Sequence, residues 1–409
     1  MTHIWQGLRS GRWLTPARAR AYSLILLGFT AIAVIGWIAV SDGLVDRNGK
    51  PLGTDFSNVY AAGTLTWQGR PAEAYEPALQ HAAENAVFGG REMPFYGWHY
   101  PPFFFAVAVL VAAFPYAWGL AIWLAASLAA YLAVIRAILP QPETLLTAAA
   151  FPAVFVNIGH GQNGFLTAAL LGGALHLLDR RPWLSGVLIG CLAYKPQFGV
   201  LIPVALVAGG YWRSIGAAAA TVAVLVAISF VTLGSGVWHA FADSTHFTQT
   251  VVLEQGNTGW EKIQSIFSAT RMWGASAPLA YGVQLALALT LAASLAWLWR
   301  SNAAFELKAA ALATGSLLAT PYVLDYDLVV LAVAIAFFAR HGLARGFRDY
   351  EISLLAAAWI VPLLSRGIAG VTGIPLGLLA LLALHFCILR RAVLDREGAT
   401  TAAPGVAQA

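Results

Sequence analysis

The chain has 409 residues, of which 59% are hydrophobic and only 11% are charged. A soluble globular domain carries about 25% charged residues, so this composition excludes an ordinary water-soluble protein. The net charge of +5 does not indicate a nucleic-acid partner, because the basic residues lie at the ends of apolar runs, as the positive-inside rule of membrane proteins predicts. Cys191 and Cys387 lie within apolar stretches and indicate neither a disulfide nor a metal site.

The N-terminal segment predicts an uncleaved first membrane span. An apolar run from Tyr22 to Val40 follows four basic residues. These are Arg9, Arg12, Arg18 and Arg20. A signal peptide is the alternative, but the run is longer than the apolar region of a usual signal. We therefore expect the N-terminus to lie in the cytoplasm.

The apolar runs together predict an all-α polytopic membrane protein with about 12 transmembrane or re-entrant helices. The predicted segments are 21–41, 100–114, 117–138, 144–158, 164–178, 184–209, 214–233, 277–299, 307–320, 326–340, 351–366 and 375–390. Twelve crossings put both termini in the cytoplasm. Most basic residues agree with that topology, but Arg180 and Arg181 would fall on the outer side. Some segment between 100 and 209 is therefore expected to be re-entrant.

Residues 1–396 are expected to form one membrane domain with two outer polar segments. The first, 42–99, contains helix-compatible pieces at 55–68 and 72–87, which we expect to lie at the membrane interface. The second is 234–276, where Glu261, Lys262 and Gln264 are expected at the surface. Residues 397–409 are small and polar and are expected to be a disordered tail.

Asp55 begins the first of these helical pieces, so a helix N-cap is the plainest interpretation. A second interpretation is a general base at the membrane surface. Phe56 and Tyr60 are its neighbours in sequence, and apolar surroundings raise the pKa of a carboxyl group. A carboxylate of that kind can accept the proton of a sugar hydroxyl.

Two basic residues are candidates for binding a phosphate. Lys195 lies deep inside the run 184–209 and precedes Pro196, which breaks a helix. Intramembrane charges are costly and usually functional, although a lysine that snorkels from a helix end is the alternative. His99, in the sequence WHYPP next to the first outer segment, is a second candidate, while its aromatic neighbours fit an interfacial belt equally well.

Two further polar breaks interrupt the apolar pattern. The first, NIGHGQN at 157–163, either lines a wet cavity or forms a plain surface turn. The second, TPYVLDYD, carries Asp325 and Asp327, which either bind a ligand or a metal or belong to a solvated turn.

Taken in chain order, these pieces resemble glycosyltransferase family 87, the membrane glycosyltransferases of the GT-C fold. The resemblance extends from about residue 20 to about residue 340 and rests on six short motifs. They are TDFSNVYAAGTLTWQGRPAEAY, HYPPFFF, GQNGFL, KPQFGVLIP, an outer QS and TPYVLDYDLV. No motif aligns after about residue 350.

The resemblance implies a polyprenyl-phosphate hexose donor, such as one carrying mannose, and an extracytoplasmic site with Asp55 as the catalytic base. It implies neither a metal nor a nucleotide cofactor. We expect a lipid-linked or envelope glycan as acceptor, a location in the plasma membrane, and Lys195 and His99 at the donor phosphate. Further substrate-binding candidates are Tyr60, Tyr100, Gln162, Asn163, Gln197, Gln264, Tyr322, Asp325 and Asp327.

Three other functions are weighed against the transferase. A secondary transporter also has broken helices and a buried lysine, but it predicts internal repeats and no long outer loop after the first span. A lipid-linked oligosaccharide ligase or polymerase would carry its key residues in a late outer loop, whereas the motifs here begin at Asp55. A membrane scaffold does not explain Lys195 at membrane depth.

Overall fold

The computed structural model describes residues 2–401, and this part of the chain is helical, with no β-strand and three isolated backbone bridges. Seven segments are long and apolar enough to cross a membrane. They are α2 (Pro16–Ala39), α6 (Tyr116–Ile138), α12 (Trp212–Leu233), α15 (Ala277–Arg300), the turn η7 (Asp325–Val330) continued by α17 (Leu331–Arg345), α18 (Glu351–Thr372) and α19 (Leu376–Thr401). The chain is thus an all-α multi-pass membrane protein, while the predicted number of about 12 helices is not confirmed.

The other apolar segments form helices that are shorter than the ~20 residues a straight crossing needs. They are α5 (Phe105–Ala112), α7 (Thr144–Ala149), α8 (Pro152–His160), α9 (Gly164–Leu177), α10 (Pro182–Cys191), α11 (Ile202–Gly209) and α16 (Phe305–Leu318). The predicted segment 144–158 is divided between α7 and α8 at Pro152, because proline cannot donate the backbone hydrogen bond of a continuous helix.

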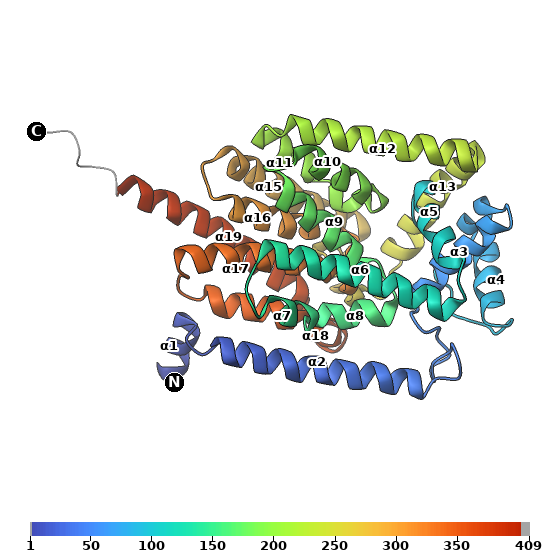
Figure 1. The fold of residues 1–409 in the computed structure, drawn as a ribbon, viewed down its shortest axis with the longest axis horizontal. Helices are drawn as coiled ribbons and strands as arrows, with labels where there is room; N and C mark the ends of the chain where they lie inside the picture. The colour runs from blue at the N-terminus through green and yellow to red at the C-terminus, as the bar shows by residue number, and fades with distance from the viewer. Residues whose placement is uncertain (1, 402–409) are drawn as a thin grey trace, which may run out of the picture.

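The most buried part of the bundle lies around α16 and α17. Leu312 and Leu317 of α16 and Phe337 and Phe338 of α17 are inaccessible to solvent. In contrast, α2 and α12 run along opposite edges of the bundle in Figure 1 and expose large apolar side chains such as Val231. Apolar side chains on the outermost helices are expected where lipid is the surrounding solvent.

Residues 184–209, predicted as one apolar segment in the region where a re-entrant segment was expected, fold back. α10 ends at Cys191, two 3₁₀ turns follow, η3 (Leu192–Tyr194) and η4 (Pro196–Gly199), and α11 then begins. The Tyr211 hydroxyl donates a hydrogen bond of 2.8 Å to the Asp179 carboxylate, so the two ends of the segment lie side by side. The segment is therefore re-entrant, with its tip near Lys195.

This return corrects the prediction that Arg180 and Arg181 lie on the opposite side of the membrane from Arg213. The Ser214 hydroxyl, next to Arg213, donates to the Pro182 carbonyl, next to Arg181, at 2.8 Å. All three arginines therefore lie at one end of the bundle. The exception to the positive-inside rule arose from counting the re-entrant segment as a crossing.

Both ends of the described chain lie at this same end of the bundle (Figure 1). α1 (Thr2–Ser10) is held there by an ion pair of 2.7 Å between Arg9 and Asp349, and α19 by one of 2.7 Å between Arg391 and Glu351. The predicted disordered tail is wrong for residues 397–401, which continue α19. Residues 402–409 lie outside the described residues.

The opposite end of the bundle carries the two polar segments. The first contains α3 (Phe56–Trp67), η1 (Pro71–Tyr75) and α4 (Pro77–Val87), close to the predicted pieces 55–68 and 72–87. The second contains α13 (Ser235–Phe247), a π-helical turn η5 (Thr248–Glu254), η6 (Trp260–Lys262) and α14 (Ile266–Met272). α3 packs directly on α5, since a Cβ at Gly63 would collide with the Ala108 carbonyl. This packing fixes the helix that Asp55 precedes.

Candidate functional site

Asp55 occupies the N-cap position of α3, but its carboxylate makes no capping hydrogen bond. Its backbone N–H instead donates to the His160 carbonyl at 3.0 Å, which joins the first polar segment to the end of α8. Gly53, with a φ of +67°, allows the preceding turn to approach this position. The side chain, in a residue that is 8% exposed, is therefore free to make other contacts, and the helix-cap interpretation does not account for it.

Three polar side chains surround the Asp55 carboxylate. The Gln162 amide donates to one oxygen at 3.3 Å, and the Thr54 hydroxyl lies 3.4 Å from the other. The His160 Nδ1 lies 3.8 Å from that second oxygen and 2.9 Å from the Thr54 hydroxyl. The carboxylate is thus oriented by fixed partners and lacks a direct lysine or arginine counterion in the described residues.

The pKa of Asp55 is lowered, which corrects the prediction that apolar surroundings raise it. Burial acts in the predicted direction, but the positive charge of Lys262, His160 and the hydrogen bonds from Gln162 and Thr54 together outweigh it. Burial lowers the pKa of His160, so its imidazole is neutral at neutral pH. Asp55 is therefore ionised at neutral pH and ready to accept a proton.

The sequence NIGHGQN at 157–163 forms a buried turn rather than a surface turn. Gly161 adopts a φ of +61° at the end of α8, and the Asn157 amide donates to the Gln162 carbonyl at 2.9 Å. Gln162 in turn accepts a hydrogen bond of 3.2 Å from the Tyr100 hydroxyl, and the Asn163 amide donates to that hydroxyl at 2.8 Å. The predicted residues Tyr100, Gln162 and Asn163 therefore belong to one network with Asp55.

Tyr326 links this network to two lysines. Its hydroxyl accepts a hydrogen bond of 3.3 Å from Gln162, and its ring centroid lies 5.6 Å from that of His160. The ammonium groups of Lys195 and Lys262 lie 5.2 and 5.6 Å from the same ring. Three polar breaks and the second polar segment, which are far apart in sequence, therefore meet around one aromatic side chain.

The two lysines differ in their partners. Lys195 forms an ion pair of 2.6 Å with Asp327, whose other oxygen accepts the Leu324 N–H at 3.0 Å. Lys262 has neither an ion pair nor a hydrogen bond from its ammonium within the described part of the chain, although the residue is only 8% exposed. The prediction that Lys262 lies at the surface is wrong, and it is the functional candidate that the sequence did not identify.

Backbone pairing explains the position of Lys262. Ile263 forms an antiparallel bridge with Leu324, and the Gln264 N–H donates to the Val323 carbonyl at 2.7 Å. The second polar segment is thereby attached to the turn before η7. No local sequence pattern around Lys262 predicts the pairing of Ile263 with Leu324, because these two residues are about 60 positions apart in the sequence.

The remaining candidates lie at the margin of this cluster or outside it. Asp325 is 3.5 Å from Arg366, and Tyr322 packs against the small apolar cluster that includes Tyr326. Gln264, which was also predicted to lie at the surface, is buried, and its amide donates to the Glu261 and Lys262 carbonyls. Within the described residues no group of three or more His, Cys, Asp or Glu is arranged to hold a metal ion.

Tyr60, His99 and Gln197 are not part of the network around Asp55. The Tyr60 hydroxyl donates to the Phe114 carbonyl at 2.9 Å, and the His99 ring contacts the Thr248 hydroxyl at 2.7 Å. Burial lowers the pKa of His99 to about 4, so the imidazole is neutral at neutral pH and the predicted cation is absent. Gln197 is half-buried and makes no side-chain hydrogen bond in the described part of the chain.

A model of glycosyltransferase family 87 matches residues 98–321, which is more than half of the chain. The match includes Gln162, Lys195 and Lys262 and leaves Asp55 and Asp327 outside. No curated protein and no solved structure gives a significant match. With its multi-pass helical architecture, the chain belongs to glycosyltransferase family 87 and is a membrane glycosyltransferase.

Proposed function

We propose that this protein transfers a hexose, such as mannose, from a polyprenyl-phosphate donor to a lipid-linked or envelope glycan, with inversion at the anomeric carbon. One observation carries the proposal: an ionised, oriented carboxylate, Asp55, belongs to the same buried cluster as Lys262, a cation without an ion-pair partner in the part of the chain that the structure describes. This reaction needs a base, which takes the proton of the attacking hydroxyl, and a cation, which stabilises the negative charge on the leaving phosphate.

The reaction balances with these two groups. The acceptor hydroxyl oxygen attacks the anomeric carbon opposite the leaving group, and Asp55 takes the hydroxyl proton. The bond between the anomeric carbon and the donor phosphate oxygen breaks through an oxocarbenium-like transition state, and its electron pair leaves with the phosphate. Negative charge therefore grows on the polyprenyl phosphate, where a fixed cation stabilises the transition state more than the ground state.

Lys262 is better suited to the phosphate than Lys195. The ammonium of Lys195 is already neutralised by Asp327 at 2.6 Å, so a phosphate would have to displace a buried ion pair. Lys262 lies over the Tyr326 ring, has no ion-pair partner within the described residues, and exerts the largest favourable charge effect on Asp55. We assign the donor phosphate to Lys262 and a supporting role, through Asp327 and Tyr326, to Lys195.

The charge distribution supports an extracytoplasmic site. Arginines at the ends of α1, α9, α12 and α17 mark one end of the bundle, while α3 and α4 lie at the other (Figure 1). By the positive-inside rule the first end is cytoplasmic, so both chain ends face the cytoplasm and the Asp55 segment faces outward. This arrangement suits a GT-C type bundle in the plasma membrane.

The testing experiment is sugar transfer from radiolabelled polyprenyl-phosphate mannose in membranes that contain the protein. Wild type is compared with Asp55→Asn and Asp55→Ala at equal abundance. Asp42→Asn is the matched control, because Asp42 lies in the same segment but is exposed and pairs with Arg91. We expect incorporation in wild type and in the control, and its loss in both Asp55 variants. Undiminished transfer by Asp55→Asn would remove this carboxylate from the mechanism.

A further inference from the structure

The proposed reaction leaves a proton on Asp55, and this proton must leave before the next transfer begins. The Asp55 side chain is only 10% exposed, so it has little direct access to water. While the product is bound, the side from which the acceptor hydroxyl attacked is also closed. The proton therefore needs a route through neighbouring polar groups, and three other sides of the carboxylate can be compared.

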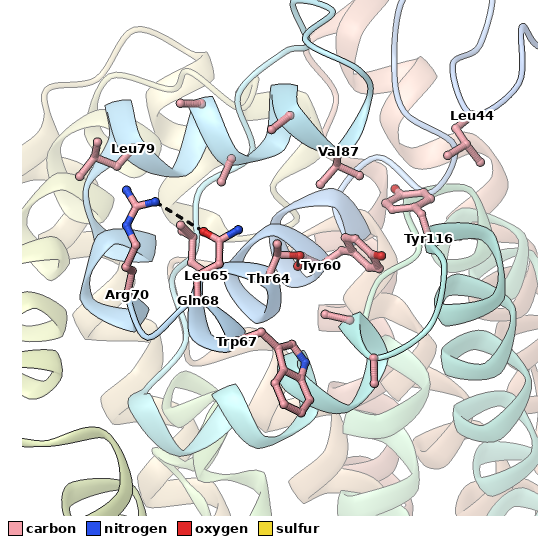
Figure 2. Close-up of a pocket in the computed structure, with 15 residues that line it drawn as sticks. Leu44, Tyr60, Thr64, Leu65, Trp67, Gln68, Arg70, Leu79, Val87 and Tyr116 are labelled. Carbon is pink, nitrogen blue, oxygen red and sulfur yellow. Dashed lines mark hydrogen bonds between the residues drawn. The ribbon is translucent and has the colours of Figure 1, made fainter.

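The side toward α4 is closed by aromatic rings. Phe56, Tyr60 and Tyr116 pack on one another with ring centroids 5.2 to 6.1 Å apart. Beyond these rings lies a hollow of about 1180 Å³ between α3, α4 and the α5–α6 turn, with Tyr60 and Tyr116 at its edge (Figure 2). Both tyrosine hydroxyls donate to backbone carbonyls, so they do not connect Asp55 with the hollow.

The side toward Gln162 holds the carboxylate but does not conduct protons. The Gln162 amide donates to Asp55 Oδ2 at 3.3 Å. Its oxygen accepts hydrogen bonds from the Asn163 N–H at 2.8 Å and from the Tyr100 hydroxyl at 3.2 Å. A side-chain amide does not titrate near neutral pH, so it acts here as a donor that fixes one carboxylate oxygen. The other oxygen, Oδ1, remains for proton exchange.

This oxygen faces Thr54 and His160. The Thr54 hydroxyl lies 3.4 Å from Asp55 Oδ1 and 2.9 Å from the His160 Nδ1, and Nδ1 itself is 3.8 Å from Oδ1. A hydroxyl can accept a proton on its oxygen while it gives up its own, and a neutral imidazole accepts a proton on its free nitrogen. The three side chains therefore form a short chain of proton donors and acceptors.

The backbone holds the two ends of this chain together. The Asp55 N–H donates to the His160 carbonyl at 3.0 Å. A Cβ at Gly161 would lie 2.7 Å from the Phe56 Cβ and 3.1 Å from the Gly53 Cα, so the two segments approach this closely only because glycine occupies that position. The separation of Asp55 and His160 is thus fixed by the fold and not by a flexible side chain.

The surroundings of His160 favour a neutral ring that is protonated only briefly. Burial lowers the pKa of His160 below its ordinary value of 6.5. Among the charged groups around the ring, Asp55 and Asp325 raise this pKa. Lys262 and Arg366 lower it. An imidazolium is therefore stabilised by the Asp55 carboxylate beside it, yet it gives up its proton at neutral pH. A group that passes a proton on requires both properties.

Beyond His160 the cluster approaches the surface. The His160 side chain is 18% exposed, compared with 10% for Asp55. Its ring centroid lies 5.6 Å from that of Tyr326. Next to Tyr326 in the chain, Asp325 lies 3.5 Å from Arg366, whose side chain is 49% exposed. Exposure therefore increases from Asp55 through His160 to Arg366, and water can receive the proton on this side.

We propose that the Thr54 hydroxyl and the His160 ring carry the acceptor proton from Asp55 to water after each transfer. The inference rests on the proposed function, in which Asp55 is the base. The proton on Asp55 Oδ1 moves to the Thr54 oxygen as the Thr54 hydroxyl proton moves to His160 Nδ1, which restores the carboxylate and forms an imidazolium. The imidazolium releases one proton to water, and exchange with water restores the ring with its proton on Nε2. His160 thus acts through Asp55 and supports turnover.

The ring tautomer tests the proposal without catalysis. His160 can accept a proton from Thr54 only if Nδ1 is unprotonated in the resting protein. The purified full chain in detergent is prepared with isotope-labelled histidine, and the nitrogen chemical shifts are measured by NMR at neutral pH. The His160 signals are those lost in His160→Gln. We expect an unprotonated Nδ1 whose shift changes in Thr54→Val. A proton fixed on Nδ1 of the neutral ring would overturn the proposal.

Transfer kinetics test the route itself, in membranes supplied with radiolabelled polyprenyl-phosphate mannose. His160→Gln keeps a polar side chain beside Thr54 but cannot carry a proton. We expect kcat to fall about tenfold at unchanged KM for the donor, less than the ~10²–10⁴-fold contribution of a general base, and imidazole in the buffer to restore part of the rate. Normal kcat, or a loss that imidazole does not reduce, would overturn the proposal. Absence of transfer by wild type would instead count against the proposed function.

Two substitutions of Thr54 isolate its hydroxyl. Thr54→Ser keeps the hydroxyl, and Thr54→Val replaces it with a methyl group. Thr64→Val makes the same change on α3, where the Thr64 hydroxyl donates to the Tyr60 carbonyl at 3.0 Å and the residue lines the hollow in Figure 2. We expect only Thr54→Val to show the loss seen in His160→Gln, with the circular dichroism of each variant like that of wild type. An equal loss in Thr54→Ser, or in Thr64→Val, would overturn the part assigned to Thr54.

Discussion

Lys195 and Lys262 are two buried lysines beside the same tyrosine ring, and they differ in whether a carboxylate of the described residues pairs with them. Lys195 lies 5.2 Å from the Tyr326 ring centroid and pairs with Asp327 at 2.6 Å. Lys262 lies 5.6 Å from that ring, and within the described residues no carboxylate pairs with it. A buried charge is costly without a partner, so the unpaired lysine indicates a place where a ligand supplies the missing anion.

The comparison teaches that depth alone does not identify a functional charge. Lys195 is the residue that membrane depth singles out, and its anionic partner is supplied by the protein itself. Lys262 lies in a polar segment, where a lysine is unremarkable by sequence. We therefore expect a substitution of Lys195 to affect mainly stability and a substitution of Lys262 to affect mainly catalysis.

The largest expected effect is on stability, from Lys195→Met. This change leaves the Asp327 carboxylate buried without its counterion, which typically costs about 3–5 kcal/mol of unfolding free energy. We expect a markedly lower Tm of the purified protein in detergent. Adding Asp327→Asn should restore most of the loss, because an amide oxygen can still accept the Leu324 N–H. A wild-type Tm for Lys195→Met alone would show that the pair contributes nothing.

The next effect is on catalysis, from Lys262→Met. Removing a preorganised group that stabilises developing negative charge typically lowers kcat by about 10²–10³-fold. We expect such a loss with Tm unchanged or raised, since no internal ion pair is broken. Steady-state transfer kinetics and thermal unfolding of the same preparation provide the two readouts. A large fall in Tm with normal kcat would exchange the roles assigned to the two lysines.

The sequence predicted those parts of the site that local patterns determine. NIGHGQN and the break at Lys195 stand out because polar residues or proline interrupt apolar runs, and such interruptions are tolerated only at protein-lined positions. Asp55 stands out as the first residue of a helical piece in the first polar segment. The helices α3 and α4 follow from the same local reasoning. Each of these features can be read from a window of some twenty residues.

The contacts that complete the site are not local. The Ile263–Leu324 bridge places Lys262, and the Lys195–Asp327 pair joins residues more than 100 positions apart. Apolar length also cannot distinguish a crossing from a fold-back, so the sequence predicted a re-entrant segment between 100 and 209 without identifying 184–209 as that segment. The lowered pKa of Asp55 depends on Lys262, so its direction could not be predicted before that lysine was located.

Glu84 is a third buried ionisable residue, and its carboxyl group is accommodated by remaining protonated and therefore uncharged. This residue of α4 is buried, and burial raises the pKa of its carboxyl group to about 9. The pKa of Glu84 in the folded state lies above the ordinary value of 4.5. The protonated Glu84 therefore contributes its full stability below pH 4.5, and this contribution is lost as the pH rises toward 9. We expect wild-type stability to fall in that window by up to about 1.4 kcal/mol per pH unit.

Glu84→Gln keeps the shape and removes the titration. Its unfolding free energy should therefore depend less on pH than that of wild type, and the two proteins should differ more at pH 9 than at pH 5. Denaturant or thermal unfolding across this range measures the difference. Parallel pH profiles of the two proteins would show that Glu84 is already ionised at neutral pH.

The smallest effect returns to the two lysines and tests the electrostatic link between Lys262 and Asp55. The positive charge of Lys262 helps to lower the pKa of Asp55, so transfer by wild type should be lost only below the ordinary range of an aspartate. Removing that charge leaves burial less opposed, and the pKa of Asp55 rises. The acid limb of kcat/KM against pH should then lie at higher pH in Lys262→Met than in wild type. The double variant Lys195→Met/Asp327→Asn should not move it, because it removes both charges of a neutral pair at once. An acid limb that moves equally in both variants would mean that the charge reaching Asp55 belongs to the whole cluster and not to Lys262.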